Sequence, residues 1–291
     1  MTPPIRPRRS ALYMPGSNAR ALEKARTIPA DVLLLDLEDA VAPDAKETAR
    51  AQVCAVVRAG GFGSREVVIR VNGLDTPWGE ADLAAAAEAV PDAILVPKVS
   101  SPNALREVGS RLAAVPERTR VWAMVETPLA ILDVEAIARA AREPATRLSC
   151  FVMGTNDLAK ETRARLVPGR APMLPWLMQA LAAARAHGLD ILDGVYNALS
   201  DEAGFRAECE QGRDLGFDGK TLIHPNQVAA ANELFAPEAG EVERARAIIR
   251  AFDLPENALS GAISLDGRMV ERLHAEMARR VVALAEAIEG R

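Results

Sequence analysis

Three carboxylates follow directly on an apolar run near the start of the chain. Residues 31–41 read DVLLLDLEDAV, and the apolar run covers residues 32–35. Asp36, Glu38 and Asp39 then fall within four positions. Like charges this close repel one another, at a cost that rises as the local dielectric constant falls. A cation such as Mg²⁺ resolves the repulsion, because it binds one or two protein carboxylates with waters and substrate oxygens. The stretch indicates either a metal site or a solvated acidic rim.

Polar residues also end later apolar segments of the chain. They are Arg70 in VVIRVNG, Lys98 in ILVPKV, Glu126 in VWAMVET, Asp157 in FVMGTNDL and His224 in TLIHP. Because side chains alternate along a strand, we expect Glu126 to share a face with Met124. By the same alternation we expect Lys98 to share a face with Ile94 and Val96. Polar strand ends are ordinary, but several carboxylates and one arginine converging on one rim favour a functional site.

Eight apolar segments alternate with Ala-rich helical segments. We expect strands near 10–14, 31–37, 66–71, 93–99, 120–125, 148–153, 189–193 and 219–224. We expect helices near 17–27, 44–58, 79–89, 102–113, 128–142, 173–187, 202–215 and 225–234. This is the count of an α/β TIM (β/α)8 barrel over residues 1–235. An open doubly wound sheet is the alternative, although no GxGxxG follows the first strand to favour a dinucleotide site.

The second expected strand shows which face would point into such a barrel. Val32, Leu34, Asp36 and Glu38 share one face, and Leu33, Leu35 and Leu37 share the other. The leucine face suits packing against the ring of helices. The acids would then lie at the carboxyl-terminal mouth of the barrel, where barrel enzymes carry out their chemistry.

A C-terminal extension, residues 236–291, follows the expected barrel. It contains a helix over 239–252, the segment ISLDGRMV with an Asp-Gly turn signal, and a long helix to about residue 289. The charged segment 160–172 carries two prolines, and we expect it to form a long loop over the active face.

Composition excludes several classes of protein. The 291 residues carry a formal net charge of −5 with acidic and basic residues interleaved, which argues against a nucleic-acid partner. No apolar run approaches the length of a membrane span. The amino terminus lacks the apolar core of a secretory signal. Three well-separated cysteines show neither metal spacing nor a disulfide framework, so a cytoplasmic location is the default.

Seven motifs occur in an order that resembles a known family. They are RSALYMPGSNARALEKA, DVLLLDLEDAV, VVIRVNG, MVETPLAILDVEAIA, FVMGTNDLAKE, LGFDGKTLIHPNQV and ISLDGRMVERL. Together they resemble the citrate lyase β-subunit-like (CitE-like) branch of the HpcH/HpaI aldolase superfamily. That branch includes malyl-CoA and citramalyl-CoA lyases. The resemblance covers the chain from about Arg9 to Ala287.

The resemblance implies a Mg²⁺-dependent carbon–carbon lyase on a TIM-type barrel, commonly a homotrimer or trimer-based hexamer. Matched motif by motif, Glu126 and Asp157 correspond to the family's metal ligands, and Glu126 thereby to a group close to the substrate. Arg70 corresponds to the substrate-binding arginine, which either stabilises an enolate or clamps a carboxylate. Glu38 and Asp39 correspond to an acidic pair close to the metal and its waters.

The motif ISLDGRMV places Asp266 where CoA-type lyases carry a catalytic aspartate contributed by a neighbouring subunit. We therefore expect the extension to reach a neighbouring subunit, with Asp266 protonating the enolate carbon. Asp-Gly is also a favoured turn pair, so a turn role is the alternative for this residue. For His224, which precedes Pro225, a structural role is favoured over that of a base.

The implied reaction is cleavage of a 3-hydroxy-carboxyacyl-CoA thioester to acetyl-CoA and a 2-oxo acid. Citramalyl-CoA would yield pyruvate and malyl-CoA would yield glyoxylate. The two substrates differ by one methyl group, which the sequence does not discriminate. Two alternatives stay open: a malyl-CoA thioesterase, and the citryl-acyl-carrier-protein lyase subunit of a citrate lyase complex.

Overall fold

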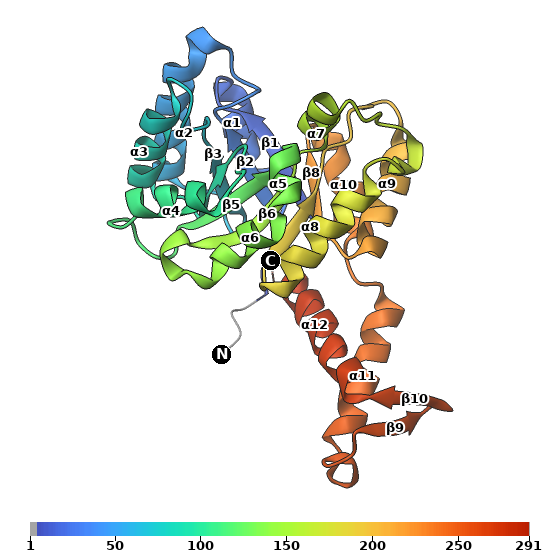
Figure 1. Cartoon of the computed structure of the whole chain (residues 1–291). Helices are drawn as coiled ribbons and strands as arrows, with labels where there is room; N and C mark the ends of the chain where they lie inside the picture. Colours follow the sequence, from blue (N-terminus) through green and yellow to red (C-terminus); the bar gives the residue numbers. More distant parts are fainter. Residues whose placement is uncertain (1–4, 291) are drawn as a thin grey trace. The chain divides into compact units, whose positions relative to one another are not determined.

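The computed structural model describes residues 5–290 of the chain (Figure 1). The chain forms two compact units. One runs from Arg8 to Glu233, and the other contains the residues from Leu234 onward together with those just before Arg8. Each unit has a hydrophobic core of its own.

Eight parallel strands close into a barrel in the first unit, in the order in which they occur in the sequence. They are β1 (Ser10–Pro15), β2 (Val32–Asp36), β3 (Glu66–Arg70), β4 (Ala93–Val96), β5 (Arg120–Val125), β6 (Leu148–Met153), β7 (Asp190–Asp193) and β8 (Gly219–Leu222). β1 pairs with both β2 and β8, which closes the ring. The predicted TIM-type barrel is confirmed, and the open-sheet alternative is wrong.

Helices follow the strands around the barrel. They are α1 (Ala19–Ala25), α2 (Lys46–Ala59), α3 (Gly79–Ala89), α4 (Pro102–Arg111), α5 (Pro128–Leu132), α6 (Val134–Arg139), α7 (Thr155–Thr162), α8 (Leu174–Ala186), α9 (Glu202–Leu215) and α10 (Val228–Leu234). The helix expected over 128–142 is interrupted at Asp133, whose φ of −111° and ψ of 13° are not helical. The expected loop 160–172 begins only after α7, which ends at Arg163 with a left-handed φ of 62°.

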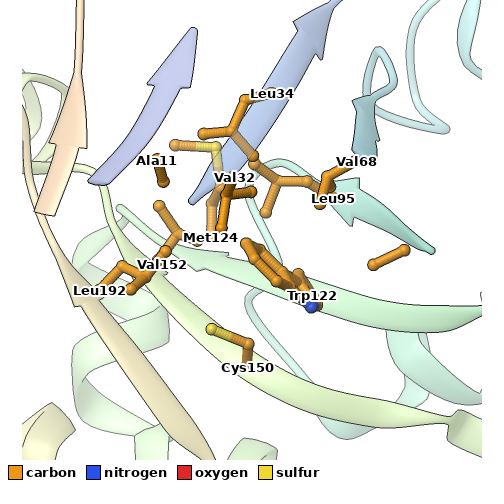
Figure 2. Close-up of a cluster of buried hydrophobic side chains, with 11 residues drawn as sticks. Ala11, Val32, Leu34, Val68, Leu95, Trp122, Met124, Cys150, Val152 and Leu192 are labelled. Carbon is orange, nitrogen blue, oxygen red and sulfur yellow. The ribbon is translucent and has the colours of Figure 1, made fainter. Parts of the chain in front are cut away.

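Apolar side chains from alternate strand positions fill the barrel (Figure 2). Val32 and Leu34 lie in this interior cluster with Trp122, as the alternation in β2 predicted. Leu33 and Leu35 are equally buried but belong to the opposite face of the strand. Full burial of a side chain of this kind stabilises the fold by about 1.5–3 kcal/mol.

The second unit contains two helices and a hairpin. They are α11 (Ala239–Asp253), β9 (Ala262–Leu265), β10 (Arg268–Glu271) and α12 (Arg272–Glu289). Asp266 and Gly267 connect the strands with φ values of 49° and 73°, the conformation of a type I′ turn. The extension predicted as helical thus also carries a β-hairpin, which the Asp-Gly signal had indicated. None of the helices within residues 5–290 has the length and apolarity needed to cross a membrane.

Candidate functional site

A cavity of about 290 Å³ opens among the carboxyl ends of the barrel strands. Its walls come from β1, β2, β3, β5, β6 and β8, from the first turn of α7 and from loops that follow the strands. The lining residues are Tyr13, Asp36, Asp39, Ala40, Arg70, Met124, Glu126, Met153, Gly154, Thr155, Asn156, Asp157, Val195, Thr221 and Ile223. Arg70, Glu126 and Asp157, which the sequence analysis singled out, therefore line one cavity. Its volume is sufficient for a four-carbon dicarboxylate.

Arg70 ends β3 and is held by carboxylates from the neighbouring strand. Asp36 is its partner in the β2–β3 register. Nε and Nη2 of Arg70 donate to the two carboxylate oxygens of Asp36 at 2.6 and 2.7 Å. Nη1 lies 2.7 Å from Glu38 and 3.1 Å from Asp39. The guanidinium also stacks over the Tyr13 ring, 4.7 Å from its centroid. No motif in the sequence marks Asp36 as the main partner of Arg70, although strand alternation predicts its place on the inward face.

A buried lysine supports the acidic turn that follows β2. Nζ of Lys46 donates to the carbonyl oxygens of Leu37 and Glu38 at 2.8 and 2.7 Å, and to Oδ1 of Asn72 at 2.8 Å. Asn72 in turn donates to the carbonyl of Leu37 and to Asp82. These bonds fix the backbone from which the Glu38 side chain projects. No motif in the sequence had indicated Lys46.

Glu126 and Asp157 approach the cavity from adjacent segments. Glu126 follows β5 and is buried, and its Oε1 accepts the backbone N–H of Lys98 at 2.7 Å. Asp157 lies in the first turn of α7, whose N-cap is Gly154. A Cβ at position 154 would contact the Glu126 side chain and lie 2.5 Å from its Oε2. The absence of a side chain at Gly154 is therefore what lets the start of α7 reach Glu126.

We expect Gly154→Ala to displace the Glu126 carboxylate. The added methyl would occupy space that Glu126 now fills, so the affinity for Mg²⁺ should fall about 10–100-fold, with a loss of stability of about 1–3 kcal/mol from overpacking. Isothermal titration with Mg²⁺ and thermal unfolding measure both effects. Gly240→Ala is the matched control, because a Cβ there meets no atom within 4 Å. Unchanged Mg²⁺ affinity in Gly154→Ala would contradict this account of the contact.

Burial and mutual repulsion alter the protonation of two carboxyl groups at the mouth. Burial, reinforced by the charge of Glu38, raises the pKa of Glu126 to about 8. Burial also raises the pKa of Glu38 to about 7, against the opposing effect of Arg70. Within residues 5–290, no group of three or more His, Cys, Asp or Glu side chains is placed to hold a metal ion. Two carboxylates in an open cavity fit Mg²⁺, which takes its other oxygens from water and substrate.

Binding of Mg²⁺ is therefore expected to release protons and to strengthen with pH. Because Glu126 must be ionised to bind a cation, the apparent affinity should rise about tenfold for each pH unit up to pH 8 and level off above it. The stability of the metal-free protein changes with pH in the opposite direction. A pKa raised from 4.5 to about 8 makes the metal-free protein less stable as pH increases through this window. Titration calorimetry at pH 6, 7, 8 and 9 in buffers of different ionisation enthalpy measures both affinity and proton release. A pH-independent affinity would contradict the expectation.

Lys98 lies near Glu38 and Glu126 because of a turn in the backbone that strand alternation did not predict. Ala93 and Leu95 of β4 point into the barrel, so Ile94 and Val96 point outward. A regular strand would therefore have placed Lys98 on the outward face with Ile94 and Val96. The strand ends at Val96, and Lys98 adopts a φ of 51°. Its ammonium lies 3.8 Å from Glu38.

Two other predicted residues lie in turns. Nδ1 of His224 accepts the backbone N–H of Asn226 at 3.2 Å, capping the turn after β8. This agrees with the structural role favoured for His224. Asp266 occupies the exposed β9–β10 turn in the second unit.

Comparison with known proteins identifies the family. Residues 9–225 match the model of the HpcH/HpaI aldolase/citrate lyase family. The chain belongs to this family. The barrel, the acidic mouth and the ordered motifs described above are thus those of an HpcH/HpaI aldolase/citrate lyase protein.

Two known proteins match this chain over nearly its whole length. The (3S)-malyl-CoA thioesterase of Cereibacter sphaeroides (strain KD131) is 51% identical over 97% of this chain and 96% of its own length. The citrate lyase subunit beta of Escherichia coli (strain K12) is 34% identical over 97% of this chain and 94% of its own.

Solved structures share this fold. CitE from Mycobacterium tuberculosis, in complex with magnesium, acetoacetate and coenzyme A, is 26% identical with a TM-score of 0.76, covering 95% of this chain and 97% of that one. A citrate lyase from Burkholderia xenovorans LB400 superposes with a TM-score of 0.83 at 19% identity, over 100% of this chain and 94% of that one. The second likeness bears on the fold alone.

Proposed function

We propose that the chain is a magnesium-dependent enzyme that hydrolyses (3S)-malyl-CoA to malate and coenzyme A in the cytoplasm. The observation that carries this proposal is the cavity that Arg70 lines together with two carboxylates of a metal-binding type, Glu126 and Asp157. A substrate with a free carboxylate and an adjacent hydroxyl complements these groups. The 51% identity to a malyl-CoA thioesterase along nearly the whole chain supports hydrolysis as the outcome.

In this proposal different side chains at the mouth bind the substrate and the metal ion. Arg70 binds the free carboxylate of the substrate, because a guanidinium pairs strongly with a carboxylate. Glu126 and Asp157 would hold Mg²⁺, which would supply a Lewis acid to the substrate. Glu38 and Asp39 lie beside Arg70 and orient it and the nearby waters.

Hydrolysis also needs a group that takes a proton from water. We assign this role to Asp266, provided by the second unit of a neighbouring subunit in a homotrimer or trimer-based hexamer. Its carboxylate accepts the proton as the water oxygen bonds to the thioester carbonyl carbon. The carbon–sulfur bond then breaks, and the proton passes to the departing coenzyme A thiolate.

Carbon–carbon cleavage is the second candidate, and membership of a family that includes citrate lyase subunits favours it. The same groups would serve. The hydroxyl proton passes to water as the carbon–carbon bond breaks, which gives glyoxylate from malyl-CoA or pyruvate from citramalyl-CoA. Asp266, here in its protonated form, then donates its proton to the acetyl-CoA enolate and is protonated again from water.

Product analysis separates the two reactions. Purified protein is incubated with (3S)-malyl-CoA and, separately, citramalyl-CoA, with Mg²⁺ or with a chelator. We expect one free thiol and one malate per malyl-CoA consumed, no 2-oxo acid, and loss of turnover with the chelator. Acetyl-CoA and glyoxylate in equal amounts without free thiol would establish the lyase instead. Turnover of neither substrate would refute both candidates.

A further inference from the structure

The backbone of Lys98 has a conformation that is rare for a residue with a side chain. Its φ of 51° lies in the left-handed region, which glycine adopts without strain. Val90 and Arg163 share this conformation as the residues that end α3 and α7, where it is common. Lys98 instead comes after a strand, directly following Pro97, at the mouth of the cavity. Strained residues of this kind concentrate at functional sites.

One consequence of the turn is a contact with a proposed metal ligand. The backbone N–H of Lys98 donates to Oε1 of Glu126 at 2.7 Å. This bond accounts for the backbone conformation but not for the lysine side chain. A glycine at position 98 would offer the same N–H with less strain. The choice of lysine therefore needs a separate reason.

The ammonium group supplies that reason. It lies 3.8 Å from Oε1 of Glu38, beyond hydrogen-bond distance, and its side chain is 47% exposed. The charges of Glu38, Asp157, Glu126 and Asp39 all act on it. It is thus a partly exposed cation near Glu38, on which the charges of the proposed metal ligands Glu126 and Asp157 also act.

Arg70, the other cation described at this mouth, is constrained differently. Its side chain is 7% exposed, and Asp36 engages Nε and Nη2 together. The position of the guanidinium is therefore fixed by the protein before any ligand arrives. Lys98 has four rotatable side-chain bonds and an exposed end, so it can follow charge that appears during a reaction.

We propose that Lys98 is a catalytic residue whose ammonium contacts the thioester carbonyl oxygen of the substrate and stabilises the negative charge that forms there. The inference rests on the proposed function, and it holds for either of the two reactions considered. Attack of water converts that carbonyl into an oxyanion, and carbon–carbon cleavage converts it into an enolate. A positive charge in contact with such an oxygen lowers the barrier in both cases.

The left-handed backbone allows an experiment that separates the side chain from the backbone. Lys98→Gly keeps the N–H to Glu126 and removes the strain, whereas Lys98→Met keeps the strain and removes the ammonium. We expect both variants to lose about 10²–10³-fold in kcat, with Mg²⁺ affinity by calorimetry within about twofold of the wild type. Lys98→Gly should unfold at the same temperature as the wild type or higher. Lys98→Arg should recover part of kcat, and Lys160→Met, which removes an exposed lysine of α7, should leave it unchanged.

Each other result overturns the inference. Wild-type kcat in Lys98→Gly would show that only the backbone matters. A raised KM with unchanged kcat would show that the ammonium binds coenzyme A in the ground state. A parallel loss of Mg²⁺ affinity and kcat in Lys98→Met would show that the lysine acts through Glu126. A wild-type protein that turns over neither thioester would refute the proposed function, and this inference with it. If the wild type is active, any of the contrary results above refutes only the role of Lys98.

Discussion

Replacing Glu126 with glutamine is expected to abolish measurable Mg²⁺ binding and to lower turnover at least about a thousandfold. Glutamine has the shape of glutamate and can still accept the Lys98 N–H at the Oε1 position. It brings no negative charge, however, and Mg²⁺ depends on anionic oxygen ligands. Calorimetry with Mg²⁺ measures the first effect, and the product assay measures the second.

The same substitution should not weaken the metal-free fold. Burial and Glu38 raise the pKa of Glu126 to about 8, so above that pH the metal-free wild type contains a buried, ionised carboxylate near other acids. The neutral amide avoids this cost. We therefore expect Glu126→Gln to unfold at the same temperature as the metal-free wild type or higher at pH 8.5. Inactive protein with intact stability would show that the loss concerns the site rather than folding.

Glu161→Gln is the matched control for this experiment. It makes the same change of charge on the exposed side of α7, one of the elements that border the cavity. Mg²⁺ affinity and turnover should stay at wild-type values. If Glu126→Gln instead kept the wild-type affinity for Mg²⁺, the metal site would lie elsewhere.

Replacing Arg70 with methionine is expected to remove activity and to lower the free energy of unfolding by about 3–5 kcal/mol. The substitution leaves the fully buried Asp36 and the buried Glu38 without their cation. Arg70→Lys restores the charge but not the planar fork that binds Asp36 through two nitrogens. We expect Arg70→Lys to regain much of the stability while KM stays raised and kcat stays low.

Urea unfolding and steady-state kinetics measure these two effects separately. Arg206→Met is the control, because Arg206 pairs with Glu233 at the surface, and its loss should change stability little. Recovery of full activity together with stability in Arg70→Lys would mean that Arg70 is only a structural counter-ion for Asp36 and Glu38. It would contradict the proposed contact with substrate.

The proposed sharing of the site between subunits extends this experiment. Arg70→Lys and Asp266→Asn should each be inactive, but co-assembled they should regain activity in the sites that combine an intact Arg70 with a neighbour's intact Asp266. Random mixing of equal amounts gives about a quarter of the sites in that state. No recovery in mixed oligomers would place both residues in the same subunit's site or remove Asp266 from the reaction.

The barrel was predictable because its signal is local and repeated. Alternation in β2 placed Val32 and Leu34 inward and Asp36 at the mouth, and the structure confirms this from the core of the barrel (Figure 2). Apolar strands that alternate with helices leave few ways to bury both faces of a parallel sheet. The ordered motifs predicted the family in the same way, and the family match confirms it.

Prediction failed where a backbone angle or a packing contact overrides the pattern. Lys98 reaches the mouth through a left-handed φ rather than through the strand phase of Ile94 and Val96. The helix expected over 128–142 is interrupted at Asp133. Pro97 signals the end of β4 but not the left-handed backbone of Lys98, and Asp133 is neither glycine nor proline.

The sequence by itself determined the barrel, the family and the polar residues that border one rim, because hydrophobic periodicity and motif order are properties of the chain alone. Only the tertiary structure decided which of these groups pair. Asp36 meets Arg70 through the register of β2 and β3, Lys46 supports the acidic turn from α2, and Gly154 admits Glu126 beside α7. These contacts join segments far apart in the chain, so their distances follow from strand register and close packing rather than from any local pattern.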